Sequence, residues 1–194
     1  MPKRVELHEK EVIFEKLIFK VEQAKLRHEK FDGTMGKEIT RLNLERGDGV
    51  AAVVHDETTD TVILIEQFRY PTYEKGPGWL LELPAGIVDD KDDSPAKTMQ
   101  REVLEEAGYE VEDLRHIHTF YLSPGGSSER IFLYYASITE ANKTTDGGGL
   151  EEEGEDIRTL KLTTAQAFEK LDNAEFHDAK TIIGLQWLRL HLRR

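Results

Sequence analysis

Residues 84–111, PAGIVDDKDDSPAKTMQREVLEEAGYEV, place a turn crowded with aspartates directly before a short amphipathic segment. Ser94 can cap a helix there, because its hydroxyl can accept from the free N–H groups of the first turn. Pro95 suits the first helical position, where no N–H partner is needed. Gly108 can end the helix, since glycine adopts the left-handed conformation without a steric penalty. The stretch therefore predicts a helix of about three turns.

Three glutamates fall close together on this predicted helix. Glu102 and Glu106 are four residues apart and Glu105 is three from Glu102, so their carboxylates share one face. A solvated acidic face tolerates this spacing, since like charges cost only about 0.2–0.5 kcal/mol per pair. Hard ions such as Mg²⁺ also need carboxylates in excess of local cations, and Arg101 is the one cation nearby. The helix by itself leaves both interpretations open.

Composition limits the classes of function that remain. The chain has 194 residues, 38% of them hydrophobic, which suits one domain with at most a small appendage. The net charge of -12 argues against a broad binding surface for nucleic acid or anionic membrane. The chain has no cysteine, which excludes disulfides and thiolate sites. The first residues show no apolar signal segment and no run of about 18 apolar residues occurs, so we expect a soluble cytoplasmic protein.

Alternating apolar and polar residues predict many short strands. Residues 4–30 suit an antiparallel hairpin or small sheet, and residues 56–60 suit a hairpin loop. Residues 163–194 are typical of two amphipathic helices, and Trp79 and Trp187 are predicted to pack in the core. The alternation continues at residues 39–44, and short β-branched strands are predicted at residues 50–54 and 61–66. Residues 78–86 form another apolar run, broken at Pro84 and Gly86, and further strands are predicted at residues 111–124, 130–138 and 157–162. Because no regular βαβ alternation is present, the pattern predicts an α+β fold with a mixed sheet flanked by helices.

The helical stretch resembles a known motif. Gly86 and the run REVLEEAGY at residues 101–109 resemble the Nudix box, G-x5-E-x7-R-E-U-x-E-E-x-G-U, where U is apolar. The second half matches fully with Tyr109 at the last apolar position. The first half is one residue longer than the pattern, and Asp92 or Asp93 stands where the pattern has its first glutamate. Since an extra residue in a turn is easily absorbed, the departure affects that first acid rather than the rest of the motif.

The resemblance extends over nearly the whole chain to ADP-ribose pyrophosphatases, with GDP-mannose pyrophosphatases close beside them. The segments that carry it, besides the box, are residues 30–54, 62–73, 79–86, 121–130, 151–157 and 182–191. It implies the Nudix fold, an α/β/α sandwich, with a small N-terminal β-sheet. It also implies that residues 46–194 form the hydrolase domain and that residues 1–45 form strands that help to build a homodimer.

The resemblance further implies a site for Mg²⁺ or Mn²⁺. The metal ligands that it implies are the Ala85 carbonyl, Glu102, Glu105, Glu106 and Glu155. In the later acidic loop it implies Glu153 as the general base that activates water, with Glu106 also in a catalytic role. Glu151 and Glu152 compete with Glu153, because the register of a loop is not fixed by one sequence. Arg101 is predicted to pair with the carboxylates and orient them.

Substrate contacts are implied at four positions. Arg41 and Arg69 match residues at the nucleotide or phosphate end, and an arginine can bind a pyrophosphate through two parallel hydrogen bonds. Ser123 and Glu129 match residues near the terminal ribose. Adenine is the favoured base, although Leu42 stands where one subgroup of ADP-ribose pyrophosphatases has a glutamate.

These implications lead to one expected function and two alternatives. We expect metal-dependent hydrolysis of ADP-ribose to AMP and ribose 5-phosphate. The alternative substrate is GDP-mannose, which would give GMP and mannose 1-phosphate. An alternative of another class is a non-catalytic Nudix module that senses nucleotide sugars. The complete R-E-x-x-E-E core of the box favours turnover.

Overall fold

The computed structural model describes residues 3–89 and 91–192, apart from the side chain of Glu153. These residues form two compact units along the chain. The first unit is Met1–Asp48 with Tyr121–Arg130, and the second is Gly49–Phe120 with Ile131–Arg194.

The first unit contains a small antiparallel sheet, as the alternating pattern predicted. Its strands are β1 (Val5–Lys16), β2 (Phe19–His28) and β3 (Ile39–Glu45), in the order β1-β2-β3. The pairing of β1 with β2 shifts register twice, once between Leu7 and Glu9 and once between Val12 and Phe14. Such bulges bend a strand and increase its twist.

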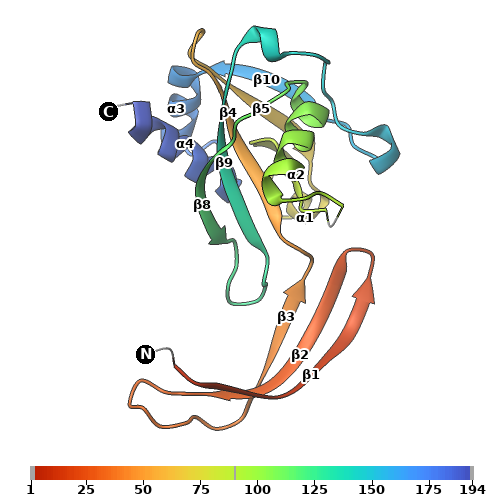
Figure 1. Cartoon of the computed structure of the whole chain (residues 1–194), viewed down its shortest axis with the longest axis vertical. Helices are drawn as coiled ribbons and strands as arrows, with labels where there is room; N and C mark the ends of the chain where they lie inside the picture. The colour runs from red at the N-terminus through yellow and green to blue at the C-terminus, as the bar shows by residue number, and fades with distance from the viewer. Residues whose placement is uncertain (1–2, 90, 193–194) are drawn as a thin grey trace. The chain divides into compact units, whose positions relative to one another are not determined.

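The second unit is built on a mixed sheet, with the strand order β10-β5-β4-β9-β8 (Figure 1). Two short strands join it, because β6 pairs with β5 and β7 pairs with β4. Strand β4 pairs antiparallel with β5 and parallel with β9, which confirms the predicted mixed sheet. The bounds are β4 (Gly49–Asp56), β5 (Thr61–Phe68), β6 (Trp79–Glu82), β7 (Ala85–Ile87), β8 (Arg115–Tyr121), β9 (Arg130–Ile138) and β10 (Arg158–Thr163).

Helices cover both faces of this sheet. The helical elements are α1 (Tyr70–Tyr73), α2 (Pro95–Glu102), the π-helical turn η1 (Val103–Ala107), the 3₁₀ turns η2 (Glu140–Asn142) and η3 (Glu151–Glu153), α3 (Thr164–Asp172) and α4 (Ala179–Leu192). In Figure 1, α2 lies on one side of the sheet and α3 and α4 lie on the other. Within the described ranges, no helix is long and apolar enough to span a membrane.

Strand β4 shows how the sequence divides the core into two layers. Its side chains alternate between faces with a period of two. Val50, Ala52 and Val54 pack in the core under α2, where Met99 and Val103 also lie. Ala51 and Val53 pack in the second core, which includes Leu185 and Leu188 of α4. The arrangement confirms the predicted sandwich of a mixed sheet between helices.

The helix of residues 95–107 begins and ends as predicted, but its last turn is not α-helical. The Ser94 side chain accepts from the Lys97 N–H over 3.3 Å, and Pro95 is the first helical residue. The last turn is π-helical instead of α-helical, and Gly108 ends it with a φ of 81°. The carbonyl of Glu106 accepts from the Gly148 N–H and from the Thr159 hydroxyl, so the turn is held by a segment distant in sequence.

One of the two tryptophans packs against the core and the other is exposed. Trp187 packs against the core beneath α4, as predicted. Trp79 was predicted to be in the core and is 60% exposed, so that prediction is wrong. Its ring lies 4.9 Å from the ring of Phe68 across the β5–β6 pair. Trp79 is the first residue of β6, and the next residue, Leu80, is buried.

Candidate functional site

The three glutamates of the helix are shielded from solvent. The exposed fraction of the side chain is 12% for Glu102 and 22% for Glu105. Glu106 as a whole residue is 1% exposed. A solvated acidic face is therefore the wrong interpretation of this helix. Burying a carboxylate is costly unless a cation or hydrogen-bond donors compensate its charge.

The compensation inside this cluster is incomplete. Burial raises the pKa of Glu102 to about 7, Arg101 opposes this rise, and repulsion from Glu105 and Glu155 adds to it. Burial also raises the pKa of Glu106 well above its ordinary value, with repulsion from Glu102 and Glu155 adding to it. Four carboxylates therefore act on one another through a region of low polarity.

Arg101 supplies the positive charge in this cluster, as predicted. One guanidinium nitrogen, Nη1, lies 2.6 Å from Oε2 of Glu105. The other, Nη2, lies 3.0 Å from Oε1 of Glu102 and 3.5 Å from Oδ2 of Asp92. Of the two aspartates considered for the first acid of the box, Asp92 is the one in contact with Arg101. The arginine orients the carboxylates from one side and leaves Glu106 to other partners.

The turn before the helix is joined directly to the glutamates. Ala85 begins β7, and its backbone N–H donates to Oε2 of Glu106 over 2.8 Å. Gly86 follows, and a Cβ built on it would lie 2.1 Å from Cδ of Glu102. A glycine is therefore required for the Glu102 carboxylate to approach the backbone this closely. These two contacts place the Ala85 turn against the acidic cluster.

The acidic loop reaches the same cluster through its glycines. The Gly149 N–H donates to the carbonyl of Glu105 over 3.0 Å. Gly149 has a φ of 80°, and a Cβ on it would lie 2.5 Å from Oε2 of Glu155. That oxygen of Glu155 also accepts from the Leu150 N–H over 2.9 Å. The loop is thereby anchored to the end of the helix with Glu155 close to Glu102 and Glu106.

The predicted general base lies on the short turn η3 of this loop. Glu151 and Glu152, its competitors, are exposed. The side chain of Glu153 lies outside the described residues. All three precede Gly154, which has a φ of 73° and ends the turn in the left-handed conformation.

The donor set fits a hard divalent cation in its chemistry. Its members offer only oxygen, and together they carry more negative charge than Arg101 balances. Their geometry is more open than a finished coordination sphere. Among residues 3–89 and 91–192, with the Glu153 side chain left out, no group of three or more His, Asp or Glu residues is close enough to hold a metal ion.

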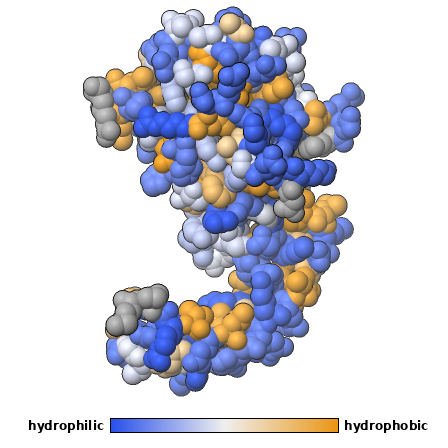
Figure 2. Space-filling view, viewed as in Figure 1, coloured by the Kyte–Doolittle hydropathy of each residue, from blue (hydrophilic) through white to orange (hydrophobic). Residues whose placement is uncertain are grey.

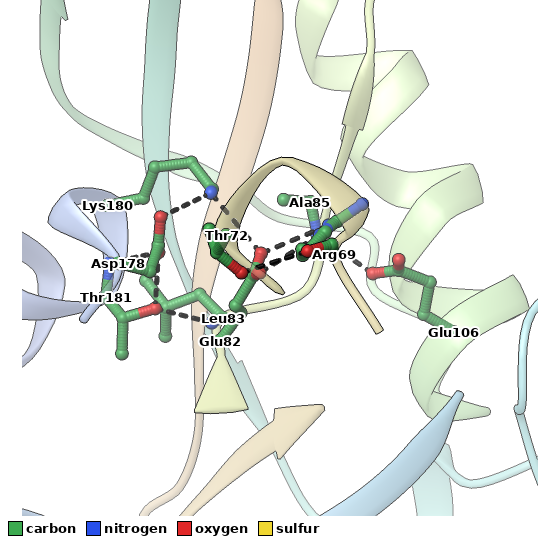
Figure 3. Close-up of polar contacts among 9 residues, drawn as sticks. All are labelled: Arg69, Thr72, Glu82, Leu83, Ala85, Glu106, Asp178, Lys180 and Thr181. Carbon is green, nitrogen blue, oxygen red and sulfur yellow. Dashed lines mark hydrogen bonds and ion pairs between the residues drawn. The ribbon is translucent and has the colours of Figure 1, made fainter. Parts of the chain in front are cut away.

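Arg69 lies beside the cluster and has a partner that the sequence analysis missed. Its Nε and Nη2 donate to the two oxygens of Glu82 over 3.0 and 3.1 Å (Figure 3). Arg69 and Glu106 are also close enough to shift each other's pKa. Glu82 is a lone charged residue within an apolar run, WLLELP, which is the signal that could have identified it.

The other predicted substrate residues belong to the first unit. Arg41 is exposed and lines a cavity of about 520 Å³ together with Leu42, Tyr121 and residues 124–128. Ser123 is exposed at the start of that loop. Glu129 is largely buried, and its Oε1 lies 3.6 Å from Nη1 of Arg46. The carboxylate cluster and Arg69 belong to the second unit.

Comparisons with known proteins agree with this geometry. The NUDIX domain family matches residues 45–183. The chain is 36% identical over 176 residues to the ADP-ribose pyrophosphatase of Escherichia coli (strain K12), covering 89% of this chain and 82% of that protein. It is 36% identical over 148 residues to the GDP-mannose pyrophosphatase of Escherichia coli O1:K1 / APEC, covering 75% of each.

A solved structure, described as the crystal structure of an ADP compounds hydrolase, has the same fold. It aligns with a TM-score of 0.73 at 21% identity and covers 98% of this chain and 95% of its own. The predicted Nudix fold is confirmed by this likeness. With the family match over most of the chain, the complete second half of the box and the buried glutamates that it places together, this chain belongs to the Nudix family.

Proposed function

We propose that this chain hydrolyses the pyrophosphate bond of a nucleoside diphosphate sugar, with ADP-ribose as the first candidate and AMP and ribose 5-phosphate as products. The observation that carries the proposal is the buried pair Glu102 and Glu106, whose charges interact with Glu155 beside the Ala85 turn. The relatives at 36% identity, which are an ADP-ribose and a GDP-mannose pyrophosphatase, support the substrate class.

The residues proposed to hold the metal are the Ala85 carbonyl, Glu102, Glu105, Glu106 and Glu155. We propose Mg²⁺, with Mn²⁺ as the alternative, because these oxygen donors suit hard cations. A bound divalent cation would neutralise phosphate charge and favour deprotonation of the attacking water. Since Glu105 now contacts Arg101 and Glu106 now accepts from Ala85, both carboxylates would rearrange toward the ion. Relief of their mutual repulsion favours that rearrangement.

The chain's own residues then divide the chemistry. Glu153 is the proposed base, with Glu151 and Glu152 as alternatives: its carboxylate takes a proton from water as the water oxygen attacks phosphorus. The bond from that phosphorus to the bridging oxygen breaks, and each product leaves as a phosphate monoester. We assign Arg69 to a phosphate of the substrate and Arg41 to the nucleotide or phosphate end. Ser123 and Glu129 are assigned to the terminal ribose.

GDP-mannose is the second candidate substrate. The GDP-mannose pyrophosphatase relative matches with the same identity as the ADP-ribose pyrophosphatase, although over fewer residues. Leu42, beside Arg41, is exposed and lines the same cavity. At this position the chain therefore lacks a glutamate that could form a hydrogen bond with the nucleotide base. A non-catalytic sensor of nucleotide sugars is the alternative of another class.

The deciding experiment measures phosphate release from ADP-ribose and GDP-mannose side by side. A phosphatase is added because it attacks the monoester products and leaves the intact diphosphates alone. Each reaction is run with Mg²⁺, with Mn²⁺ and with chelator, and a phosphatase-only reaction is the control. Faster metal-dependent release from ADP-ribose supports the first candidate, and preference for GDP-mannose supports the second. Binding of either compound without turnover would identify a sensor.

We also infer a homodimer formed through residues 1–45, with residues 46–194 as the hydrolase domain. The support is the apolar surface of β1 and β2, which Figure 2 shows as orange atoms on these strands. The exposed apolar residues of this surface, which we call the hairpin patch, are Val5, Leu7, Val12, Ile13, Phe14, Leu17, Ile18 and Phe19. A concentration of exposed apolar side chains on one hairpin is typical of association surfaces in proteins.

A further inference from the structure

Beside the carboxylate cluster, the second unit contains a connected network of charged groups, of which the proposed chemistry uses only Arg69. It runs from Arg69, before α1, through Glu82 of β6 to Lys180 of α4 (Figure 3). It continues to Asp178 and Thr181 at the start of α4. Networks of ionic groups in protein interiors are favourable only when every member has its partners.

Glu82 is the centre of this network. It is 2% exposed, and both of its oxygens accept from Arg69. Oε2 also lies 3.4 Å from Nζ of Lys180. A carboxylate buried in this way needs strong partners, and here two cations supply them. Removing its charge would weaken the hold on Arg69, whereas Lys180 would keep its closer contact with Asp178.

The contact with Glu82 uses one edge of the Arg69 guanidinium and leaves the other. A guanidinium has five N–H groups in a planar fork. Glu82 takes Nε–H and one hydrogen of Nη2, which leaves Nη1 and the second hydrogen of Nη2. Among the described residues, Nη1 makes no hydrogen bond. That remaining edge can bind two oxygens of a phosphate at once.

The electrostatics of Arg69 agree with this geometry. Burial would lower the pKa of Arg69, but Glu82 and then Glu106 and Asp178 raise it above its ordinary value. The guanidinium therefore stays charged between Glu82 on one side and the carboxylate cluster on the other. The hydrogen bonds with Glu82 also keep the Arg69 guanidinium from pairing with Glu106. In the described part of the chain, Arg69 and Glu106 form no hydrogen bond.

The far end of the network holds the backbone near the Ala85 turn. Asp178 accepts from Lys180 over 2.7 Å and from the Thr181 N–H and hydroxyl over 2.9 and 2.7 Å. The Thr181 oxygen in turn accepts from the Leu83 N–H over 2.8 Å. Burial alone would raise the pKa of Asp178, but Lys180 and Thr181 lower it below its ordinary value. Helix α4 thus fixes the segment between β6 and β7 two residues before Ala85.

We propose that Glu82 is a positioning residue, which holds one edge of Arg69 so that the other edge faces a substrate phosphate, and that Lys180 holds Glu82 in place. The inference rests on the proposed function. It explains how Glu82 and Lys180, which touch no substrate, affect substrate binding and hydrolysis. Glu82 acts through Arg69. Replacing Glu82 should therefore have no further effect on substrate binding or turnover when Arg69 is already absent.

A double-mutant cycle on Glu82→Gln and Arg69→Ala tests this dependence, since it isolates the interaction between the two residues. We expect each single variant to lower kcat/KM by about 10–100-fold, the usual effect of losing such a supporting contact. The double variant should be no worse than Arg69→Ala alone. Losses that multiply in the double variant would overturn the proposal, because they would show that Glu82 acts independently of Arg69.

A second variant and a control separate positioning from general damage to the fold. Lys180→Met removes the second cation from Glu82, and its smaller loss should likewise vanish in the Arg69→Ala background. If Glu82→Gln does not fold, as thermal unfolding would show, the cycle with Lys180→Met decides. Asp172→Asn is the control, because Asp172 pairs with Arg189 over 2.8 Å between α3 and α4 and has no contact with the network. It should leave kcat/KM unchanged.

The same four proteins are also compared by calorimetry, which measures the dissociation constant of ADP-ribose in the presence of chelator. This measurement does not depend on turnover. The expected result is a loss of affinity of about 10-fold in each single variant, as for other lost charge-assisted contacts, with no further loss in the double variant. Wild-type protein that binds without turnover contradicts the proposed function, and the binding cycle then decides the inference. Additive losses of affinity, or wild-type protein that does not bind, would overturn it.

Discussion

The backbone N–H of Ala85 donates to Oε2 of Glu106 over 2.8 Å, and so joins the first residue of β7 to the π-helical turn after α2. Glu106 is 1% exposed, and repulsion from Glu102 and Glu155 adds to the effect of its burial. The Ala85 N–H is the first contact that opposes this rise in pKa, with Arg69 acting from farther away. Added positive charge beside Glu106 would therefore favour its ionised form.

Replacing Glu106 by glutamine should abolish activity without unfolding the protein. The amide oxygen can still accept from Ala85, and loss of an uncompensated buried charge should keep the melting temperature without metal at or above that of wild type. We expect kcat to fall by at least about 100-fold, since even supporting partners of metal ligands account for 10–100-fold. The rise in melting temperature on adding Mg²⁺ should also disappear. Glu110→Gln, at an exposed position, is the control, and full turnover of Glu106→Gln would refute the metal assignment.

Replacing Gly86 by alanine should separate activity from stability. The added Cβ would lie 2.1 Å from Cδ of Glu102, which is the end of a flexible side chain, so the carboxylate moves and the backbone stays. We expect a fall in kcat/KM of at least about 10-fold and a change in unfolding free energy below about 1 kcal/mol. Enzyme assays and urea denaturation measure the two effects. Gly76→Ala, whose Cβ would meet only the Thr72 carbonyl at 3.5 Å, should change neither.

Asp56 should make the protein more resistant to denaturation at neutral pH than in acid. Its Oδ1 accepts from the Thr58 hydroxyl and from the N–H groups of Thr58 and Thr59, and these bonds lower its pKa to about 2. Because the folded pKa is below the unfolded value of about 3.9, the stabilisation is complete above pH 4 to 5 and is lost as the pH falls toward 2.

The variant Asp56→Asn checks this pH dependence. At pH 7 it should be less stable than wild type by about 1.5–3 kcal/mol, the usual value for hydrogen bonds to a charged group. The difference should shrink between pH 5 and pH 2.5, as measured by urea denaturation at each pH. A difference that stays constant over this range would show that the charge of Asp56 does not contribute.

The hairpin patch should hold two chains together. Introducing charge at its centre with Phe14→Asp should turn a dimer into a monomer, because Phe14 is about half exposed in one chain and would be buried in the pair. Light scattering during size-exclusion chromatography measures the mass. Leu190→Asp is the matched control, since Leu190 is also an exposed apolar residue but lies on α4 of the second unit. A wild-type monomer at all concentrations would contradict the inference.

Local signals in the sequence were sufficient for several features of the fold. The serine cap, the first-turn proline and the glycine stop located the helix of the box, because each acts on backbone groups within one turn. Short runs rich in β-branched residues likewise located β4 and β5 and the loop at residues 56–60 between them. The family itself could be recognised from the nine residues at 101–109, whose spacing is a local property of the chain.

Only the tertiary structure decided which of these groups are buried and which partners they have. The sequence left Glu106 on an acidic face, whereas packing against β7 and the acidic loop makes it a buried carboxylate. Glu82 received no role from the sequence, yet it binds Arg69, 13 residues away, and Lys180, 98 residues away. The physical reason is that solvation and pairing of charge depend on which distant segments surround a group. A short window of sequence fixes backbone conformation, and the folded chain fixes electrostatics.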